Sequence, residues 1–178
     1  METNVETVST EHLSPLYEAI QVNDTLIERN AYKIITHNEE VFCSKEQIEE
    51  KLEANVSNHI ILYFSDRQIS LIYRDKEVEL SLNHGELLRY LFLYSKEELP
   101  VTKGHVYELF RNLNDSGELS TNTFVQAITR LRRRVNQCEI PTTLIRTGSY
   151  QNETAYYYSK EIPFIVIHRS DSSFILHQ

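Results

Sequence analysis

Hydrophobic residues recur with helical spacing between positions 120 and 137. Their spacing of three and four residues places them on a single stripe of an α-helix: Phe124, Ile128, Leu131 and Val135. The opposite face carries polar and basic side chains and no acid: Gln126, Thr129, Arg130 and Arg133. The pattern predicts an amphipathic helix. Its basic face either suits phosphate oxygens and guanine edges or is simply a solvated helix surface.

The chain after this helix has the pattern of a β-hairpin. Residues 142–147 and 155–159 are rich in β-branched and aromatic residues, and the polar stretch 148–154 separates them. A hairpin directly behind a basic helix is typical of winged-helix DNA-binding domains, in which the helix enters a groove and the hairpin, or wing, lies on the neighbouring backbone. We therefore interpret 120–137 as a recognition helix and 142–159 as its wing.

The chain before the basic helix changes from strand-like to helical patterns. Three short runs predict a small antiparallel sheet: 60–64, 68–73 and 77–80. Two helices are then predicted, over 83–94 with an N-terminal cap at Asn83, and over 103–111. The sheet, the two helices and the recognition helix together predict a helix-turn-helix with a sheet at its N-terminal side.

Residues 1–58 carry strand and helix signals of their own. The run 26–36 predicts a strand, and 41–43 predicts a second strand that pairs back on it. The sequence Ser44-Lys45-Glu46-Gln47 has the form of a capping box and predicts a helix over 45–54. This segment is a candidate for dimerisation or regulation.

The C-terminal segment contains two apolar runs, 162–167 and 174–176, which predict a terminal hairpin. The predicted fold class is therefore α+β, with a winged helix-turn-helix, an N-terminal α/β extension and a C-terminal hairpin. The predicted units are 1–58, 59–160 and 161–178.

Four motifs carry a family resemblance over about residues 60 to 159, a little over half of the chain. They are Leu80-Ser81 before Leu87-Leu88 and Leu91, Val101-Thr102 before Val106 and Phe110, Phe124-Val125-Gln126-Ala127-Ile128-Thr129-Arg130-Leu131-Arg132, and Ile145-Arg146-Thr147. In order and spacing they resemble the first helix, the second helix, the recognition helix and the start of the wing of the OmpR/PhoB-type winged-helix DNA-binding domain, most closely its ToxR-like branch.

The resemblance implies a transcriptional regulator that binds double-stranded DNA, with a small antiparallel sheet before the first helix. It also implies that loop 112–119 faces RNA polymerase, although a plain polar connector is an equal interpretation of that loop. The sequence departs from the family in three places. His84 replaces the usual Glu of the first helix, Glu153 stands at the wing tip where it would repel phosphate, and no transmembrane helix follows the wing.

Charge is distributed unevenly along the chain. Residues 1–100 hold 9 Lys and Arg against 19 Asp and Glu, whereas residues 120–150 hold five Arg and one Glu. Screening over roughly 8 to 10 Å lets such a basic stretch act locally despite the overall charge of −8. No apolar run approaches the roughly 20 residues of a membrane helix, and the acidic N-terminus does not resemble a signal peptide. We expect a soluble, cytoplasmic protein.

The sequence contains no pattern that predicts an enzyme, a cofactor or a metal site. The two cysteines, Cys43 and Cys138, are isolated, and the seven histidines do not follow metal-ligand spacing. There is no phosphate loop and no nucleophile elbow among the four glycines. The segment before the winged helix, about 58 residues, is too short for a receiver domain.

The predicted function is sequence-specific DNA binding in transcription regulation. Gln126 and Arg130 are the candidates for base contacts, and the candidates for phosphate contacts are Thr123, Thr129, Arg132, Arg133, Arg146 and Thr147. A homodimer is expected, because one recognition helix rarely binds tightly enough alone. The alternative is a winged helix that binds another regulator or RNA polymerase without reading DNA.

Overall fold

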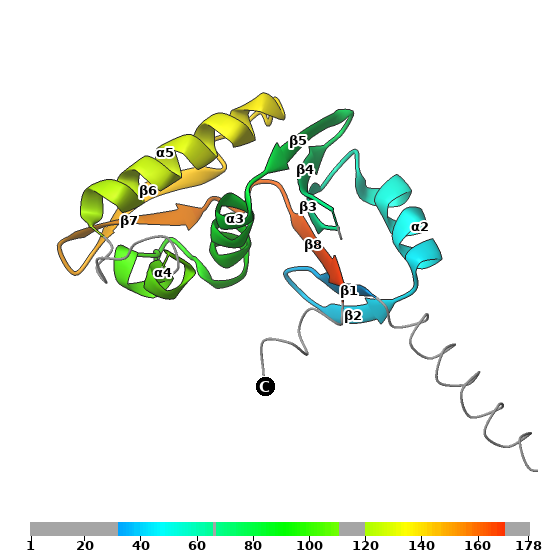
Figure 1. Ribbon diagram of the computed structural model, residues 1–178, viewed down its shortest axis with the longest axis horizontal. Helices are drawn as coiled ribbons and strands as arrows, with labels where there is room; N and C mark the ends of the chain where they lie inside the picture. The colour runs from blue at the N-terminus through cyan, green and yellow to red at the C-terminus, as the bar shows by residue number, and fades with distance from the viewer. Residues whose placement is uncertain (1–31, 66, 111–119, 170–178) are drawn as a thin grey trace, which may run out of the picture.

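The structure is a computed structural model that describes residues 32–65, 67–110 and 120–169. Within these ranges the protein is α+β, as predicted, with a six-stranded sheet, a two-stranded sheet and helices packed around them (Figure 1). None of the helices in these ranges is long and apolar enough to cross a membrane.

The first two strands form the predicted hairpin. β1 (Tyr32–Ile35) pairs antiparallel with β2 (Glu40–Cys43), while the earlier part of the predicted strand, 26–31, lies outside the described residues. α2 (Lys45–Asn55) begins with the predicted capping box. Ser44 Oγ accepts a hydrogen bond from Gln47 N–H, and Gln47 Oε1 accepts one from Ser44 N–H.

The three predicted strands before the first long helix are present: β3 (Ile60–Phe64), β4 (Ile69–Tyr73) and β5 (Lys76–Leu80). Each pairs antiparallel with the next along the chain. A two-residue turn joins β4 to β5, and Arg74 adopts a positive φ of 55° there.

β8 (Phe164–Arg169) lies in the middle of the large sheet, antiparallel to β1 and parallel to β3. The strand order is therefore β2-β1-β8-β3-β4-β5 (Figure 1). The sequence predicted a terminal hairpin between this run and 174–176, which lie outside the described residues. Within the described residues β8 instead has a partner strand at each edge. The sheet is consequently mixed, and it contains strands from all three predicted units.

Three helices and a second sheet fill the chain between β5 and β8. The helices are α3 (Leu82–Tyr94), α4 (Lys103–Phe110) and α5 (Thr121–Gln137), and the second sheet is the hairpin of β6 (Ile145–Tyr150) and β7 (Glu153–Tyr158). The three helices occur where the sequence predicted them. The hairpin is also present, but β6 begins three residues later than the predicted strand 142–147. The N-cap of α3, however, is Ser81 and not Asn83, because Ser81 Oγ accepts the hydrogen bond from His84 N–H.

Both faces of the large sheet are covered. α2 covers one face through a small cluster: Ile34, Cys43, Ile48, Ile61, Ile165 and Ile167. α3 and α5 pack on the other side in a larger cluster, whose members include Ile60, Leu62, Leu71, Val166, Leu88, Leu91, Ile128 and Leu131. Ile128, Leu131 and Leu88 are fully buried, as predicted, whereas the side chain of their predicted neighbour Phe110 lies outside the description.

Aromatic side chains join the β6–β7 hairpin to the large sheet. Phe92 of α3 stacks on Phe164 of β8 with ring centroids 4.9 Å apart, and the Tyr158 ring of β7 lies edge-on to both. Tyr158 N–H also donates a hydrogen bond to the buried Ser95 Oγ at 2.8 Å. The hairpin is therefore fixed to the end of α3 and to β8.

Candidate nucleic-acid interface

α5 begins with a cap that uses one of the predicted contact residues. Ser120 Oγ accepts a hydrogen bond from Thr123 N–H at 3.1 Å, and the hydroxyl oxygens of Ser120 and Thr123 lie 2.8 Å apart. The cap gives a partner to an amide that has none within the helix, and so stabilises its first turn. Thr123, which is half-buried, thus contributes to the cap.

The buried stripe of α5 decides which of its side chains face outward. The four stripe residues are at most 3 % exposed: Phe124, Ile128, Leu131 and Val135. Because successive helical residues are rotated by about 100°, the opposite face consists of five residues, all of them exposed: Asn122, Gln126, Thr129, Arg133 and Gln137. Arg130 is also exposed and lies at one border of this face. The facing that the sequence predicted for α5 is confirmed.

Three predicted contact residues on α5 keep their polar groups available. The side chains of Gln126, Arg130 and Arg133 form no hydrogen bond or ion pair with another residue in the described parts of the chain. Thr129 differs, because its hydroxyl donates to Val125 O at 2.8 Å and keeps only acceptor capacity. One amide and two guanidinium groups can therefore donate to an acceptor outside the protein.

Arg132 lies on the flank of α5 that faces the hairpin. Its Nε and Nη2 donate to Ile145 O at 3.1 and 2.8 Å, and Nη2 also donates to Thr147 Oγ1 at 2.8 Å. Its guanidinium lies 5.2 Å from the ring centroid of Tyr156. Arg132 and Thr147, both predicted as phosphate contacts, thus bind each other and join α5 to β6. This pairing could not be predicted from the sequence, because it depends on where the hairpin returns to α5.

Arg146, the remaining predicted contact, is exposed on β6 and forms an ion pair with Glu161. The side chains are 46 % and 37 % exposed, so the pair is at the surface. Such pairs contribute about 0 to 1 kcal/mol. An incoming phosphate can therefore displace Glu161 at little cost.

A second group of basic side chains lies on the other flank of α5, toward α3. Arg130 and Arg134 are one helical turn apart there, and His84 is in the first turn of α3. Burial, Arg134 and Arg130 lower the pKa of His84 from its ordinary value of 6.5, so both guanidinium groups act on the imidazole. Arg134 was not among the predicted contacts, and His84 was noted only as a departure from the family pattern.

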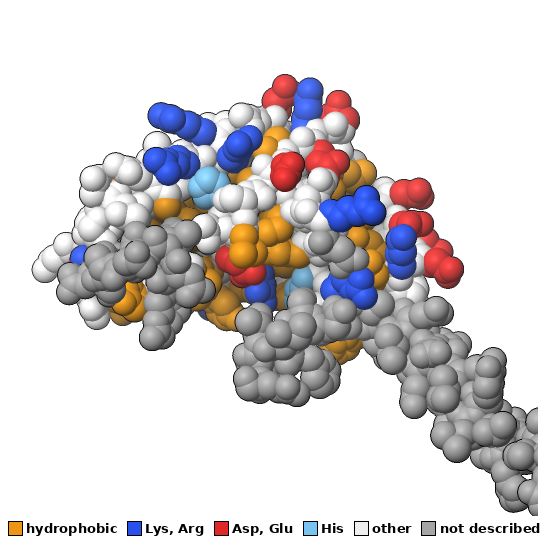
Figure 2. All heavy atoms as spheres, viewed as in Figure 1, with side chains coloured by type: hydrophobic (Ala, Val, Ile, Leu, Met, Phe, Trp, Pro, Cys, Tyr) orange, Lys and Arg blue, Asp and Glu red, His pale blue; other side chains and the backbone are white. Residues whose placement is uncertain are grey.

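The surface around α5 is positive although the whole chain is acidic. Figure 2 shows Lys and Arg side chains over α5 at the upper left, with a histidine among them, while Asp and Glu side chains lie over α2 on the right and at the top, toward β4 and β5. α5 contributes four arginines and no acid: Arg130, Arg132, Arg133 and Arg134. Because solvent screens charge over roughly 8 to 10 Å, the distant acids do not cancel this local field.

The tip of the β6–β7 hairpin is shorter than predicted. Residues 148–150 and 153–154, expected in a loop, are paired strand, and only Gln151 and Asn152 form the turn. Their φ values of 51° and 64° fit a two-residue turn that matches the twist of a hairpin. Glu153 follows directly and is exposed, so a carboxylate stands beside the tip, as the sequence predicted.

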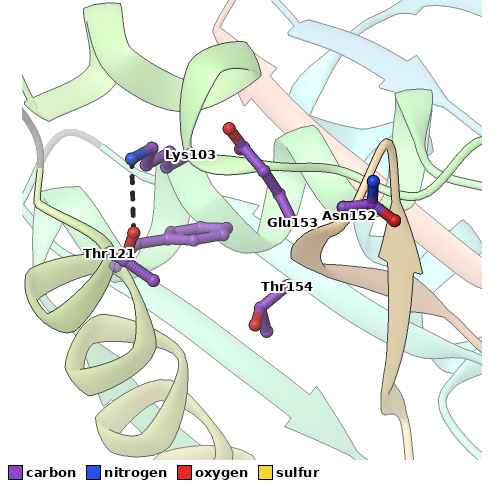
Figure 3. A pocket seen from close by; sticks show the side chains of 6 residues that line it. Lys103, Thr121, Asn152, Glu153 and Thr154 are labelled. Carbon is purple, nitrogen blue, oxygen red and sulfur yellow. Dashed lines mark hydrogen bonds between the residues drawn. The ribbon is translucent and has the colours of Figure 1, made fainter.

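A pocket of about 220 Å³ lies between the start of α5 and the hairpin tip (Figure 3). Lys103, at the start of α4, donates from Nζ to Thr121 Oγ1 at 3.2 Å on one side of it. The hairpin residues Asn152, Glu153 and Thr154 line the other side. The pocket holds one lysine and one glutamate, so it has no net preference for an anion.

The cysteines lie apart from the basic surface. Cys43 and Cys138 are buried free thiols. Cys138 Sγ donates to Leu71 O at 3.3 Å, and burial, with a smaller contribution from Glu77, raises the pKa of its thiol to about 11. Among the described residues, no three His, Cys, Asp or Glu side chains are placed to hold a metal ion.

Comparison with known protein families and with curated proteins identified no relative. No family model matches the sequence, and no curated protein matches it. The outward face of α5, its two flanks and the attached hairpin are therefore the basis for assigning a function.

Proposed function

We propose that this protein is a sequence-specific DNA-binding transcriptional regulator, in which α3, α4, α5 and the β6–β7 hairpin form an OmpR/PhoB-type winged helix of the ToxR-like branch. The outward face of α5 carries the proposal. It presents available amide and guanidinium donors and no acid, while the opposite face is fixed in the core. Its 17 residues make a helix about 25 Å long, which the major groove can accommodate.

The attachment of the hairpin supports the same function. A wing must keep a fixed distance from the recognition helix if both are to contact one duplex. Arg132 supplies this link through its bonds to Ile145 O and Thr147 Oγ1. Arg146 lies between these two residues on β6, where a phosphate can compete with Glu161 for its guanidinium.

The proposed roles follow from these positions. Gln126 and Arg130 read base edges, because an amide and a guanidinium can form paired hydrogen bonds with adenine and guanine. Thr123, Arg133 and Arg146 are the proposed contacts to backbone phosphates. Thr129 can serve as one only when its hydroxyl gives up its hydrogen bond to Val125 O. Arg132 and Thr147 hold the wing beside the same backbone. We also propose that the protein acts in the cytoplasm as a homodimer. The loop that would contact RNA polymerase, 112–119, lies outside the described residues.

One observation favours a second candidate, a winged helix that binds a protein partner. Glu153 stands beside the hairpin tip, and Arg146 is already paired with Glu161. A wing with these carboxylates is less suited to DNA than the helix is. In this case the basic face of α5 would contact an acidic surface of another regulator or of RNA polymerase.

A binding assay with the full chain separates the two candidates. Fluorescence anisotropy with short duplexes of mixed sequence, over a range of salt concentrations, should give measurable binding that weakens as salt rises. Selection from a random duplex library should then enrich one sequence. Gln126→Ala should weaken binding to that sequence, whereas Gln68→Ala, an exposed glutamine at the β3–β4 turn, should not. Absence of binding at the lowest salt would contradict the proposal and favour the protein partner.

A further inference from the structure

We infer that His84 and Arg134 form a phosphate-binding subsite, next to Arg130, on the side of α5 away from the hairpin, and that DNA binding there is coupled to uptake of a proton by His84. This inference rests on the proposed function. It assigns the phosphate contacts with the DNA strand opposite the wing to residues of α3 and α5.

The two flanks of α5 differ in how their cations are used. On the hairpin flank, Arg132 is bound to Ile145 and Thr147, and Arg146 is paired with Glu161. On the α3 flank, Arg130 has no hydrogen-bond or ion-pair partner among the described residues. Arg134 has one contact, from Nη1 to Gln137 Oε1 at 3.5 Å, at the limit of a hydrogen bond. The available positive charge therefore lies on the side away from the wing.

His84 completes this group from a second element. It is the third residue of α3, where the helix dipole places partial positive charge. Its backbone N–H is already bound to Ser81 Oγ, which fixes the first turn and hence the position of the imidazole. The side chain is half-buried and remains open to solvent on one side. The guanidinium of Arg134 and the imidazole of His84, beside a helix N-terminus, match the charge and acceptor oxygens of a phosphate.

The charged groups on the elements packed around His84 explain why its proton is sensitive to a ligand. They are Arg130 and Arg134 on α5, Glu86 and Arg89 on α3, Glu77 and Glu79 on β5, and Lys103 and His105 on α4. Glu86 is paired with Arg89 at 3.2 Å. Burial and the two α5 arginines lower the pKa of His84, and no described carboxylate offsets them. A bound phosphate would supply the missing negative charge.

The sign of the coupling follows from these charges. In the free protein the pKa of His84 is lowered, so the imidazole is neutral at neutral pH. A phosphate beside it favours the imidazolium and raises this pKa in the complex. DNA affinity should thus be greatest below the lowered pKa of the free protein, and the gain should be lost as pH rises through the higher pKa of the complex. Between the pKa of His84 in the free protein and its pKa in the complex, the affinity for DNA should change by up to about tenfold per pH unit.

The test measures the affinity of the full chain for a short duplex of mixed sequence between about pH 5.5 and pH 8, at constant ionic strength. The wild type should bind more tightly as pH falls. His84→Gln keeps a polar side chain of similar reach but cannot gain a proton, and it should lose this pH dependence. The matched control is His37→Gln, an exposed histidine between β1 and β2, which should keep the wild-type dependence.

A second measurement follows the proton directly. The imidazole resonances of His84, titrated by NMR with and without the duplex, should show a higher pKa in the complex, and Arg134→Ala should reduce this rise. An unchanged pH dependence in His84→Gln, or an unchanged pKa on binding, would overturn the subsite and leave the proposed function in place. Absence of duplex binding by the wild type at every pH would instead overturn the proposed function.

Discussion

At the scale of single residues, neighbouring arginines of α5 have different surroundings and should have different roles. Arg133 is at the centre of the outward face, whereas Arg130 is at its border with α3, one turn after Gln126. An arginine at a guanine edge contributes roughly 1 to 3 kcal/mol of discrimination between bases, whereas one on phosphate strengthens binding to every sequence. We assign the first role mainly to Arg130 and the second to Arg133.

We therefore predict that Arg130→Ala weakens binding to the selected sequence more than binding to a scrambled duplex. Arg133→Ala should weaken both alike and reduce the salt slope by about one unit. Binding curves for both variants on both duplexes, over a salt series, measure this difference. Equal losses on the two duplexes for Arg130→Ala would contradict its assignment to a base edge.

Gly85 shows how one residue sets the distance between α3 and the sheet. A Cβ at this position would lie 2.8 Å from Ile69 Cγ2 and 3.0 Å from Ile69 Cδ1. Alanine is the better helix former by roughly 0.5 to 1 kcal/mol, but overpacking a core costs about 1 to 3 kcal/mol. Gly85→Ala should therefore lower the free energy of unfolding, although alanine usually stabilises a helix.

Urea unfolding of Gly85→Ala, Ile69→Ala and the double variant tests this cause. Ile69→Ala removes both atoms that the new methyl group would meet, so the double variant should be more stable than the sum of the single losses predicts. Additive losses would show that the clash with Ile69 is not the reason.

At the scale of elements, Arg132 is the main polar connection between α5 and the β6–β7 hairpin. Arg132→Met keeps the apolar stem over Tyr156 but removes both donors to the carbonyl of Ile145, which is 2 % exposed. A buried acceptor without its partner costs about 1 to 3 kcal/mol. We predict a loss of stability in this range and faster hydrogen exchange in β6. The matched control is Arg133→Met, an exposed change that should stay within about 0.5 kcal/mol.

Elements with local signals were predicted well from the sequence. α5 has a stripe of four apolar residues and the cap Ser120, and α2 has a complete capping box. The cap of α3 was misassigned because Ser81 and Asn83 are both good N-caps, and packing of the first turn decides between them. The hairpin was found, but its strands were placed too far from the turn, because Ser149 and Thr154 are polar at exposed, paired positions.

The site could be predicted only as far as the facing of α5. Gln126, Arg130 and Arg133 follow from helical periodicity, and the structure leaves them available. The partners of Arg132 and Arg146 lie 13 to 15 residues away, and their pairing requires the return path of the hairpin. His84 and Arg134 come together only because α3 packs against α5. Such contacts between elements leave no periodic signal in the sequence.

At the scale of the whole molecule, the position of β8 could not be read from the sequence. Its apolar run is equally compatible with a terminal hairpin and with a central strand buried on both faces. In the structure Phe164 and Val166 face the larger core cluster, while Ile165 and Ile167 face the smaller one. β8 thus joins the β1–β2 hairpin to β3 and contributes to both cores.

We predict that deleting residues 164–178 abolishes cooperative folding, whereas deleting 170–178, which leaves β8 intact, does not. The four apolar side chains of β8 are at most 4 % exposed, and burying them contributes roughly 6 to 12 kcal/mol. This is comparable to the whole stability of a typical domain, roughly 5 to 15 kcal/mol. Thermal unfolding followed by circular dichroism compares the two deletions. A fragment of residues 59–160 that unfolds cooperatively by itself would contradict the prediction, because it lacks β8, the strand that pairs with the edge of β3 opposite β4.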